Sequence, residues 1–488
     1  MAQTHEGWRQ THEGRGDRPA RLLVDEPEIG CAGAAAVAGA VENAADRLSQ
    51  LARRRPADRS RTARPQSPAS AIQRSRSRGP ASRSIRRLVW FVPKLLLAER
   101  RKRGTPRGRG RCQGKPPGPP RLLRYARPGS LSVVTARLSV PLSVLDLCPV
   151  PTGESTGEAL RRSVDLARHV ERWGFTRYWV AEHHSMPGIA SSAPAVLVGR
   201  LASATSAMRV GSGGVMLPNH APLAVAEQFG TLEAMHPGRI DLGIGRAPGT
   251  DRATARALRR SADGLDPADF AAQLAELQGY FAGQATADGS LGQIRAIPAE
   301  GNEPAMWLLG STGFSAQLAG QLGLPFAFAY HFSAANARPA LALYRQTFTP
   351  SAWLAEPYSI VSVSALCAKD DATAHWLHGS SRLASLRLRS GRPSTLPSPE
   401  EAAERSYSAA EQAVIAETTA SHVVGGLDAV TGLLDQLVAS TRADELMVTT
   451  STFGHADRLT SYELLAQAAG LGEQLSISPA DSRSRGNS

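Results

Sequence analysis

The segment Pro237-Gly-Arg-Ile-Asp-Leu-Gly-Ile-Gly-Arg246 joins the end of one predicted helix to a short apolar run that finishes on an arginine. Pro237 and Gly238 end the helix predicted at 222–235, because both residues are poor helix formers. The apolar run at 240–244 is too short for a helix and is bounded by turn residues, so it predicts a buried strand. A helix that leads directly into a buried strand is typical of a parallel α/β sheet.

The same alternation continues on both sides of this segment. Short apolar runs predict seven further strands, at 138–145, 178–181, 208–216, 306–309, 325–329, 358–367 and 445–449. Helices are predicted between and after them, at 155–174, 192–205, 267–281, 315–322, 335–344, 427–438 and 458–468, with a longer helical region interrupted at 391–399. Eight strands, each followed by a helix, favour a closed (β/α)8 barrel, the TIM barrel, over a doubly wound open sheet with fewer strands.

Two serines are expected to cap the first two helices. Ser155 opens a capping-box pattern with Glu158, and Ser192 precedes Pro194 in the first turn of the next helix. A serine at this position accepts a hydrogen bond from an N–H group of the first turn. In a TIM barrel the active site lies on loops after the C-terminal ends of strands, so the informative residues are those just past 181, 216, 244, 309, 329 and 449.

The positive charge of the chain is concentrated in its first quarter. The 488 residues hold 56 Lys and Arg against 43 Asp and Glu, a net charge of +13. Residues 1–137 hold 30 basic and 10 acidic side chains, a balance of +20, which leaves 26 basic and 33 acidic ones, a balance of −7, in residues 138–488. This distribution excludes a basic nucleic-acid-binding surface spread over the whole protein.

Residues 1–137 are predicted to be a disordered extension, because an Arg-, Pro- and Ser-rich stretch repels itself and buries little apolar surface. One alternative is an RNA- or DNA-binding arm, which is disfavoured because no aromatic residues are interleaved at stacking intervals. Another is that the stretch does not belong to the working protein, since a start at Val133 or Val134 would remove nearly all of it. We expect residues 138–470 to form the barrel and 471–488 a flexible tail.

Several other classes of protein are disfavoured. The four cysteines lie far apart without a CxxC pair, which argues against a disulfide framework or a structural zinc site and fits a reducing cytosol. The apolar stretch 88–98 is interrupted by Pro93 and Lys94, and a membrane helix needs about 20 apolar residues. The first 30 residues carry six acidic side chains and lack the apolar centre of a secretory signal. We therefore expect a cytoplasmic protein without a membrane partner.

Glu182-His183-His184 follows the second predicted strand. A carboxylate and two imidazoles at a barrel mouth can transfer protons near neutral pH. Adjacent side chains of an extended segment point to opposite sides, so both imidazoles are poorly placed for one metal ion, and no metal site is predicted. His184 could instead hold the loop through hydrogen bonds. The tripeptide is therefore a candidate for proton transfer rather than for metal binding.

Two consecutive glycines, Gly213 and Gly214, interrupt the third predicted strand. Glycines inside a strand usually mark a bulge or a place where a flat ligand meets bare backbone. A cis peptide bond between residues other than proline would also be tolerated here more readily than between residues with side chains. The pair therefore marks this strand end as a candidate ligand contact.

Two features at neighbouring strand ends are typical of phosphate binding. Arg246 ends the fourth strand, and a guanidinium fork suits a phosphate monoester. Gly310-Ser-Thr-Gly-Phe-Ser315 leads from the fifth strand directly into a helix, where backbone N–H groups and hydroxyls attract an anion. Each feature alone is more often a turn or a cap, and together they predict one phosphate held from two sides. The stretch 243–249 lacks the third glycine of a GxGxxG dinucleotide loop.

These strings together resemble the bacterial luciferase-like flavin-dependent monooxygenases. The resemblance covers essentially all of 138–470 and rests on 179–184, 210–218, 237–246, 310–315 and 444–447, with Arg458, Ser461 and Tyr462 near the end. It implies a TIM barrel that binds FMN. His183 matches the active-site histidine of the family, with Glu182 as its catalytic neighbour. The implied cofactor-binding residues are Gly213 and Gly214 at the family's cis peptide, Met216, Asn219, Arg246, Gly310, Ser311, Phe314 and Ser315, while Tyr330, His331 and Phe332 would also line the pocket.

The chemistry that the resemblance implies is two-component oxygenation. Reduced FMN from a separate flavin reductase would react with O2, and one oxygen atom would pass to a small organic substrate. His183 would act as a general acid or base, a contribution of about 10²–10⁴ in rate. Gly245 stands where luciferases carry a reactive cysteine, so light emission is not expected. The family also allows a homodimer.

Other functions stay open at this stage. Relatives that use a deazaflavin, coenzyme F420, transfer hydride without O2, and the two phosphate features would serve either cofactor. A flavin-binding protein without catalysis is a further alternative, although Glu182, His183 and the full set of eight strands favour an enzyme. A nucleic-acid binder that uses the basic arm is a third. The substrate is not revealed by the sequence.

Overall fold

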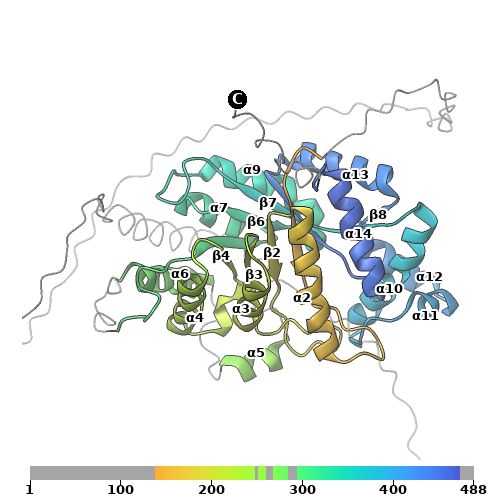
Figure 1. Cartoon of the computed structure of the whole chain (residues 1–488), viewed down its shortest axis with the longest axis horizontal. Coiled ribbons are helices and arrows are strands. Elements are labelled where there is room, and N and C mark those ends of the chain that lie inside the picture. The colour runs from red at the N-terminus through yellow and green to blue at the C-terminus, as the bar shows by residue number, and fades with distance from the viewer. Residues whose placement is uncertain (1–137, 248–250, 260–266, 284–293, 473–488) are drawn as a thin grey trace, which may run out of the picture. The chain divides into compact units, whose positions relative to one another are not determined.

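The residues that the structure describes form a closed parallel barrel (Figure 1). The computed structural model describes residues 138–247, 251–259, 267–283 and 294–472, so the predicted basic extension and most of the predicted tail lie outside them. Eight strands pair in parallel in the order β1-β2-β3-β4-β5-β6-β7-β9, and β9 pairs with β1 to close the ring. They are Leu142–Asp146, Arg177–Val180, Arg209–Met216, Ile240–Gly245, Ala305–Gly310, Phe326–Ala329, Ser359–Cys367 and Glu445–Thr449. The predicted TIM barrel is confirmed, and the open sheet is excluded.

A ninth strand, β8 (Val423–Gly425), lies outside the barrel ring. It pairs in parallel with the last residues of β7, from Ala365 to Cys367, beyond the part of β7 that pairs with β9. This strand was not predicted, because three residues are too few for an alternation of apolar and polar positions.

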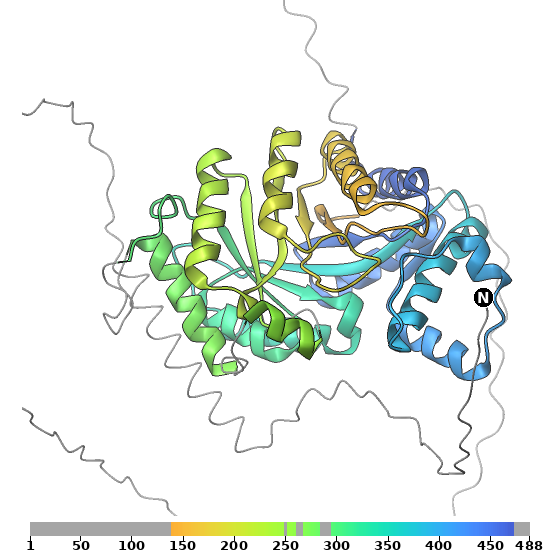
Figure 2. The ribbon, with the colours of Figure 1, turned by 90° about the horizontal axis from the view of Figure 1, so that it is seen from below.

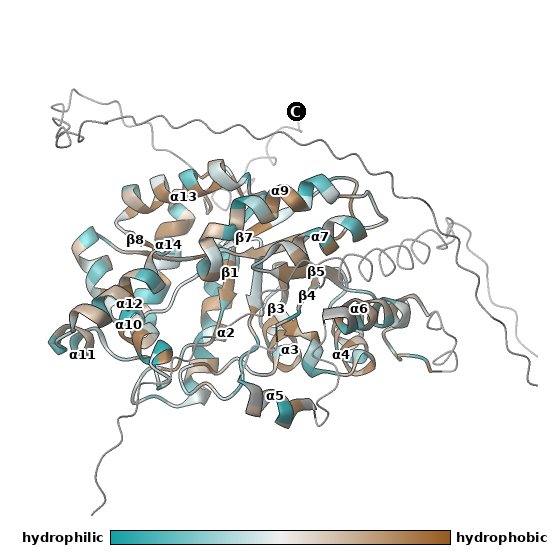
Figure 3. Cartoon of the chain, turned by 180° about the vertical axis from the view of Figure 1, so that it is seen from behind, coloured by the Kyte–Doolittle hydropathy of each residue, from teal (hydrophilic) through white to brown (hydrophobic). Residues whose placement is uncertain are grey.

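Helices surround the barrel and connect its strands (Figures 1 and 2). In Figure 3 hydrophobic colouring follows the strands and the helix faces turned toward them, while hydrophilic colouring lies on outer turns. None of the helices in the described ranges is long and apolar enough to cross a membrane. The α-helices are α2 Thr156–Trp173, α3 Pro194–Ala204, α4 Pro222–Met235, α5 Arg252–Arg259, α6 Pro267–Ala282, α7 Gly313–Leu322, α8 Tyr330–Ser333, α9 Ala337–Thr347, α10 Asp371–Arg389, α11 Pro399–Glu404, α12 Ala409–Thr419, α13 Leu427–Thr441 and α14 His455–Ala468, and the short 3-10 helices are η1 Leu217–Asn219 and η2 Ala334–Asn336.

One of the two predicted helix caps is confirmed. The Ser155 hydroxyl accepts a hydrogen bond from the backbone N–H of Glu158 at 3.1 Å, and α2 ends at Gly174 with φ of 90°. The prediction for Ser192 is wrong, because α3 begins at Pro194 and its N-cap residue is Ala193.

Apolar and aromatic side chains fill the interior of the barrel. The rings of Trp179 and Trp307 meet edge to face, with their centroids 5.3 Å apart. Both side chains belong to a buried cluster inside the barrel, together with Leu145, Ala181, Ala327, Ile360 and Met447. The barrel is therefore a packed core rather than a pore, as its eight-stranded geometry dictates.

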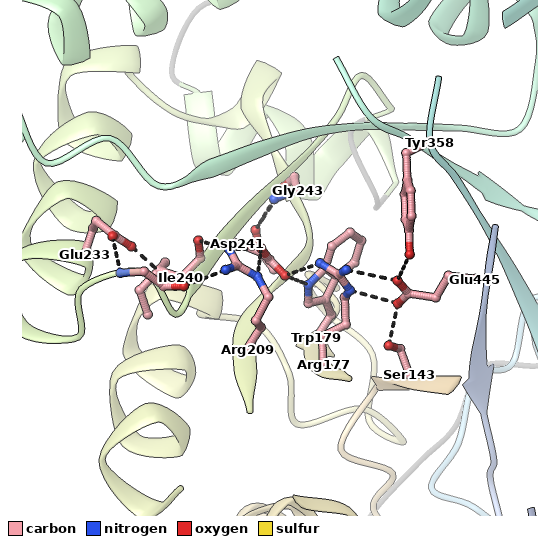
Figure 4. A network of polar contacts seen from close by, with 12 residues as sticks. Ser143, Arg177, Trp179, Arg209, Glu233, Ile240, Asp241, Gly243, Tyr358 and Glu445 are labelled. Atoms are coloured by element: carbon pink, nitrogen blue, oxygen red, sulfur yellow. Dashed lines mark hydrogen bonds and ion pairs between the residues drawn. The ribbon is translucent and has the colours of Figure 1, made fainter. Parts of the chain in front are cut away.

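A network of buried charges lies at the N-terminal ends of the strands (Figure 4). We call Arg177, Arg209, Asp241 and Glu445 the basal ion network. Arg177 donates to Asp241 at 2.9 Å and to both oxygens of Glu445 at 2.8 and 2.9 Å. Arg209 also donates to Asp241, and both carboxylates are fully buried. The network therefore links strands β2, β3, β4 and β9 at the end opposite to the one where a TIM barrel carries its active site.

Candidate active site

A cavity of about 170 Å³ lies at the C-terminal ends of the barrel strands. One water molecule needs only ~10–15 Å³ of such space, so the cavity has room for an organic molecule. Leu145, Ala181 and Ala327 belong both to its wall and to the buried cluster around Trp179 and Trp307, which therefore closes the cavity from below. The other residues of the wall are Leu147, His183, Gly213, Met216, Gly245, Arg246, Ala247, Leu309, Gly310, Ser311, Thr312, Ser315, Ala329, His331, Phe332 and Ser362.

One end of the cavity has the composition of an anion site. The guanidinium carbon of Arg246 lies 4.6 Å from the centre of the Phe314 ring, so the ring supports the guanidinium by a cation–π contact. Arg246 lines the cavity beside Ser311 and Thr312, and Thr312 is the N-cap residue of α7. Within the described part of the chain, the Thr312 side chain accepts no capping hydrogen bond from the first turn of this helix. A cation, two hydroxyl side chains and a helix N-terminus thus meet at one place, as a phosphate monoester requires.

His183 reaches the same cavity from the end of β2. Its backbone N–H donates to the carbonyl of Ser191 at 2.9 Å, which fixes the loop that carries the imidazole. An imidazole in a largely apolar cavity can exchange a proton with a bound molecule near neutral pH. The structure thus brings His183 and Arg246 together in one cavity.

Glu182 does not share this position. Its side chain is fully buried and accepts hydrogen bonds from Nε2 of His184 and Nε2 of His220, both at 2.9 Å, and from the backbone N–H of Met216 at 3.0 Å. Burial raises the pKa of this carboxyl, but the hydrogen bonds and the charge of His220 outweigh it, so the pKa lies below its usual value. Glu182 therefore ties the loop after β2 to the start of η1, and it lies outside the cavity wall.

The residues at the end of β3 divide between the cavity and the barrel interior. The Gly213–Gly214 peptide is cis, and Gly213 and Met216 line the cavity, whereas Gly214 and Asn219 do not. A β-carbon at Gly213 would lie 2.7 Å from Leu145 Cδ1, and one at Gly214 would lie 2.9 Å from the carbonyl oxygen of Gly243. The backbone of β4 thus excludes a side chain at Gly214, whereas a side chain at Gly213 would have to displace the end of Leu145.

Sequence reasoning found part of the cavity wall and missed another part. His331, Phe332, Gly310, Ser311 and Ser315 line it as expected, while Tyr330 and Phe314 stay outside. The wall residues it missed are mostly small or apolar and come from the ends of several strands: Leu145, Leu147, Ala181, Gly245, Ala247, Leu309, Ala327, Ala329 and Ser362. Their position just before or after a strand end was the available signal, but their side chains look like those of an ordinary core.

Metal binding has no support in the part of the chain that the structure describes. No group of three or more His, Cys, Asp or Glu side chains there is placed to hold a metal ion. Both Nε2 atoms that meet Glu182 must carry a hydrogen, because the carboxylate only accepts. His184 and His220 are therefore hydrogen-bond donors to Glu182 in this structure.

Fold and cavity together define a TIM-barrel protein whose C-terminal mouth brings a histidine, an arginine and a helix N-terminus to one cavity. Residues 140–455 match the family described as luciferase-like monooxygenase. The chain belongs to this family of oxygenases.

Two relatives illustrate the range of the family. A luciferase-like monooxygenase of Escherichia coli strain K12 is 46% identical over 67% of this chain and 96% of its own length. The N-acetyl-S-alkylcysteine monooxygenase of Bacillus subtilis is 32% identical over 67% of this chain and 98% of its own length.

Solved structures agree with the fold. The crystal structure of apo-MsnO8 has a TM-score of 0.61 and 37% identity, over 68% of this chain and 99% of that one. The oxygenating constituent of 3,6-diketocamphane monooxygenase from Pseudomonas putida, in complex with FMN, has a TM-score of 0.50 and 16% identity, over 68% and 98% of the two chains. This last likeness concerns the fold alone.

Proposed function

We propose that the protein is an FMN-dependent, two-component monooxygenase, which receives reduced FMN from a separate flavin reductase and uses O2 to oxygenate a small organic substrate. The observation that carries this proposal is the meeting of an anion site and an imidazole in one cavity with mostly apolar walls. Arg246, Ser311 and the start of α7 fit the phosphate of FMN, and His183 lines the same space. Bound reduced FMN would supply the activation of O2.

The residues of this chain have separate tasks in the proposed reaction. Arg246, supported by Phe314, would hold the phosphate and thereby fix the position of the cofactor. Leu145, Leu147 and Phe332 would limit the access of water to the reacting atoms. His183 would hold or release a proton at its imidazole during oxygen transfer.

A thioether is the first class of substrate to test. The relative from Bacillus subtilis acts, by its name, on N-acetyl-S-alkylcysteine. Nearly the whole length of that relative aligns with this chain. The alkyl part of such a compound suits the apolar wall formed by Leu145, Leu147 and Phe332. Oxygen uptake that depends on both reduced FMN and the thioether would support this substrate class.

Replacing Arg246 by methionine should weaken the binding of FMN about 10- to 100-fold. Charge-assisted hydrogen bonds are worth about 1.5–3 kcal/mol each, and the aliphatic variant keeps most of the packing volume. The measurement is an anaerobic titration with reduced FMN, repeated with riboflavin, which lacks the phosphate. We expect riboflavin to bind the parent and the variant equally.

Arg338→Met is the matched control, because it removes the same charge from an exposed position on α9. It should leave the affinity for FMN unchanged. Equal affinity of the parent and of Arg246→Met for FMN would contradict the proposed phosphate site.

The same titrations separate the alternative functions. Preferential binding of reduced coenzyme F420, with no oxygen uptake after air is admitted, would identify a hydride-transfer enzyme. Retention of FMN without turnover would indicate a flavin-binding protein.

We also propose that residues 138–470 carry the activity without residues 1–137. The family match begins at residue 140, and the relatives align along nearly their whole length with two thirds of this chain. Deleting residues 1–133 should change the affinity for FMN less than twofold. Loss of FMN binding on deletion would contradict this division, and salt-sensitive retention of RNA by the full chain alone would assign the extension to nucleic acid.

A further inference from the structure

The cavity wall divides into two halves by the strands that supply it. Strands β3, β4 and β5 carry Arg246, Ser311 and the other groups proposed to hold the cofactor. Strands β6, β7, β1 and β2 supply the remaining wall, which includes His331 and His183. β2 and β6 are four strands apart in a ring of eight, so the two imidazoles reach the cavity from opposite sides.

The hydrogen bond of His331 fixes the tautomer of its ring. Its Nδ1 lies 3.0 Å from the backbone carbonyl oxygen of Ser362, on the neighbouring strand β7. A carbonyl oxygen can only accept, so Nδ1 must carry a hydrogen. In the neutral ring Nε2 then has a free lone pair and acts as an acceptor.

The surroundings of His331 keep the ring neutral at physiological pH. The pKa of His331 is lowered to about 4, mainly by burial. The hydrogen bond to Ser362 opposes this shift, while His422 and His183 add to it. The imidazoles that bind the Glu182 carboxylate differ from His331, because both donate through Nε2. In His331 the hydrogen bond from Nδ1 to Ser362 thus makes Nε2 a hydrogen-bond acceptor.

Phe332 lies next to His331 and adds an apolar surface. The two ring centroids are 4.1 Å apart, and Phe332 lines the cavity although 72% of its surface is exposed. A large exposed aromatic side chain at a cavity is typical of a place that a ligand covers. The pair therefore presents one acceptor atom beside an apolar face.

We propose that His331 is a substrate-contacting residue whose Nε2 accepts a hydrogen bond from an N–H or O–H group of the organic substrate, while Phe332 covers its apolar part. This inference rests on the proposed function, because it places the cofactor on the β3–β5 side and the substrate on the β6–β7 side. It names the substrate class more closely: a largely apolar molecule that carries a hydrogen-bond donor.

The test compares two probes of nearly the same shape, benzyl alcohol and ethylbenzene, which differ by a hydroxyl in place of a methyl group. Ligand-observed NMR titrations give the ratio of their dissociation constants for the full-length parent and for His331→Phe, each with and without oxidised FMN. One neutral hydrogen bond corresponds to about 3- to 10-fold in affinity. We expect the ratio to shift by this factor in favour of ethylbenzene in the variant.

Several results would overturn the proposal. These are an unchanged ratio, a failure of the parent to bind either probe, or a His331→Phe variant that loses FMN rather than the preference for the alcohol. If the variant does not fold, ¹⁵N shifts of His331 in the parent decide. We expect a protonated Nδ1 and an unprotonated Nε2 at pH 7, and a change in the Nε2 chemical shift when benzyl alcohol is added. The reverse tautomer, or an unchanged Nε2 shift, would refute the proposal. FMN retention by the parent tests the proposed function separately.

Discussion

Replacing His183 by alanine is expected to lower kcat about 10²- to 10⁴-fold while the affinity for FMN stays within about threefold of the parent value. The imidazole lines the cavity from the end of β2, whereas the anion site is built from β4, β5 and the start of α7. Loss of the imidazole should therefore remove a proton-transferring group without disturbing the phosphate contacts. Oxygen uptake and product formation measure kcat, and an anaerobic titration measures the affinity.

His184→Gln is the control for His183→Ala. His184 is adjacent in sequence but donates to Glu182, and glutamine keeps an N–H donor for that carboxylate. This variant should retain kcat within a few-fold of the parent value. Similar losses in both variants would mean that the loop geometry, and not the His183 imidazole, limits the rate.

Replacing Arg177 by methionine should lower the free energy of unfolding by about 3–5 kcal/mol, the usual cost of breaking a buried ion pair by removing one partner. Arg177 contacts two fully buried carboxylates, Asp241 and Glu445, and the variant leaves Glu445 without its guanidinium. Urea denaturation of the FMN-free protein measures the effect. FMN affinity of the folded variant should persist, since the network lies at the other end of the barrel.

Two further variants separate the buried charge from lost packing. Arg209→Met should cost less than Arg177→Met, because the Arg209 side chain is 30% exposed and Asp241 keeps its contact with Arg177. Combining Arg177→Met with Glu445→Gln should recover part of the stability, because the second change removes the buried charge left alone. If the double variant is less stable than Arg177→Met, lost packing rather than an uncompensated charge explains the effect.

The barrel could be predicted from the sequence because its strands are buried and short. The runs at 240–244 and 445–449 coincide with β4 and β9 to within one residue. The predicted starts are wrong at β1, which begins at Leu142 rather than 138, and at α3, where Ser192 does not cap the helix. Apolar composition locates a strand, but hydrogen bonds set where it begins, and these depend on its neighbours.

The candidate site was predictable in its charged and polar residues and less so in its geometry. Arg246, Ser311 and His183 stand at strand ends, where chemistry in this fold is concentrated. The side-chain alternation that argued against a metal ion also separates Glu182 from His183, which the family resemblance had paired. The hydrogen bonds that Glu182 receives come from His184, His220 and Met216, and the bond from His220 required the fold to bring η1 close.

The packed interior under the cavity has a kinetic consequence. Trp179, Trp307 and the basal ion network fill the barrel below the cavity, so in the described part of the molecule the cavity ends blindly on that side. On the proposed function, cofactor and substrate would then arrive and depart at the strand ends. If one of them sits deeper than the other, it would enter first and leave last, and an excess of the outer ligand would trap the inner one.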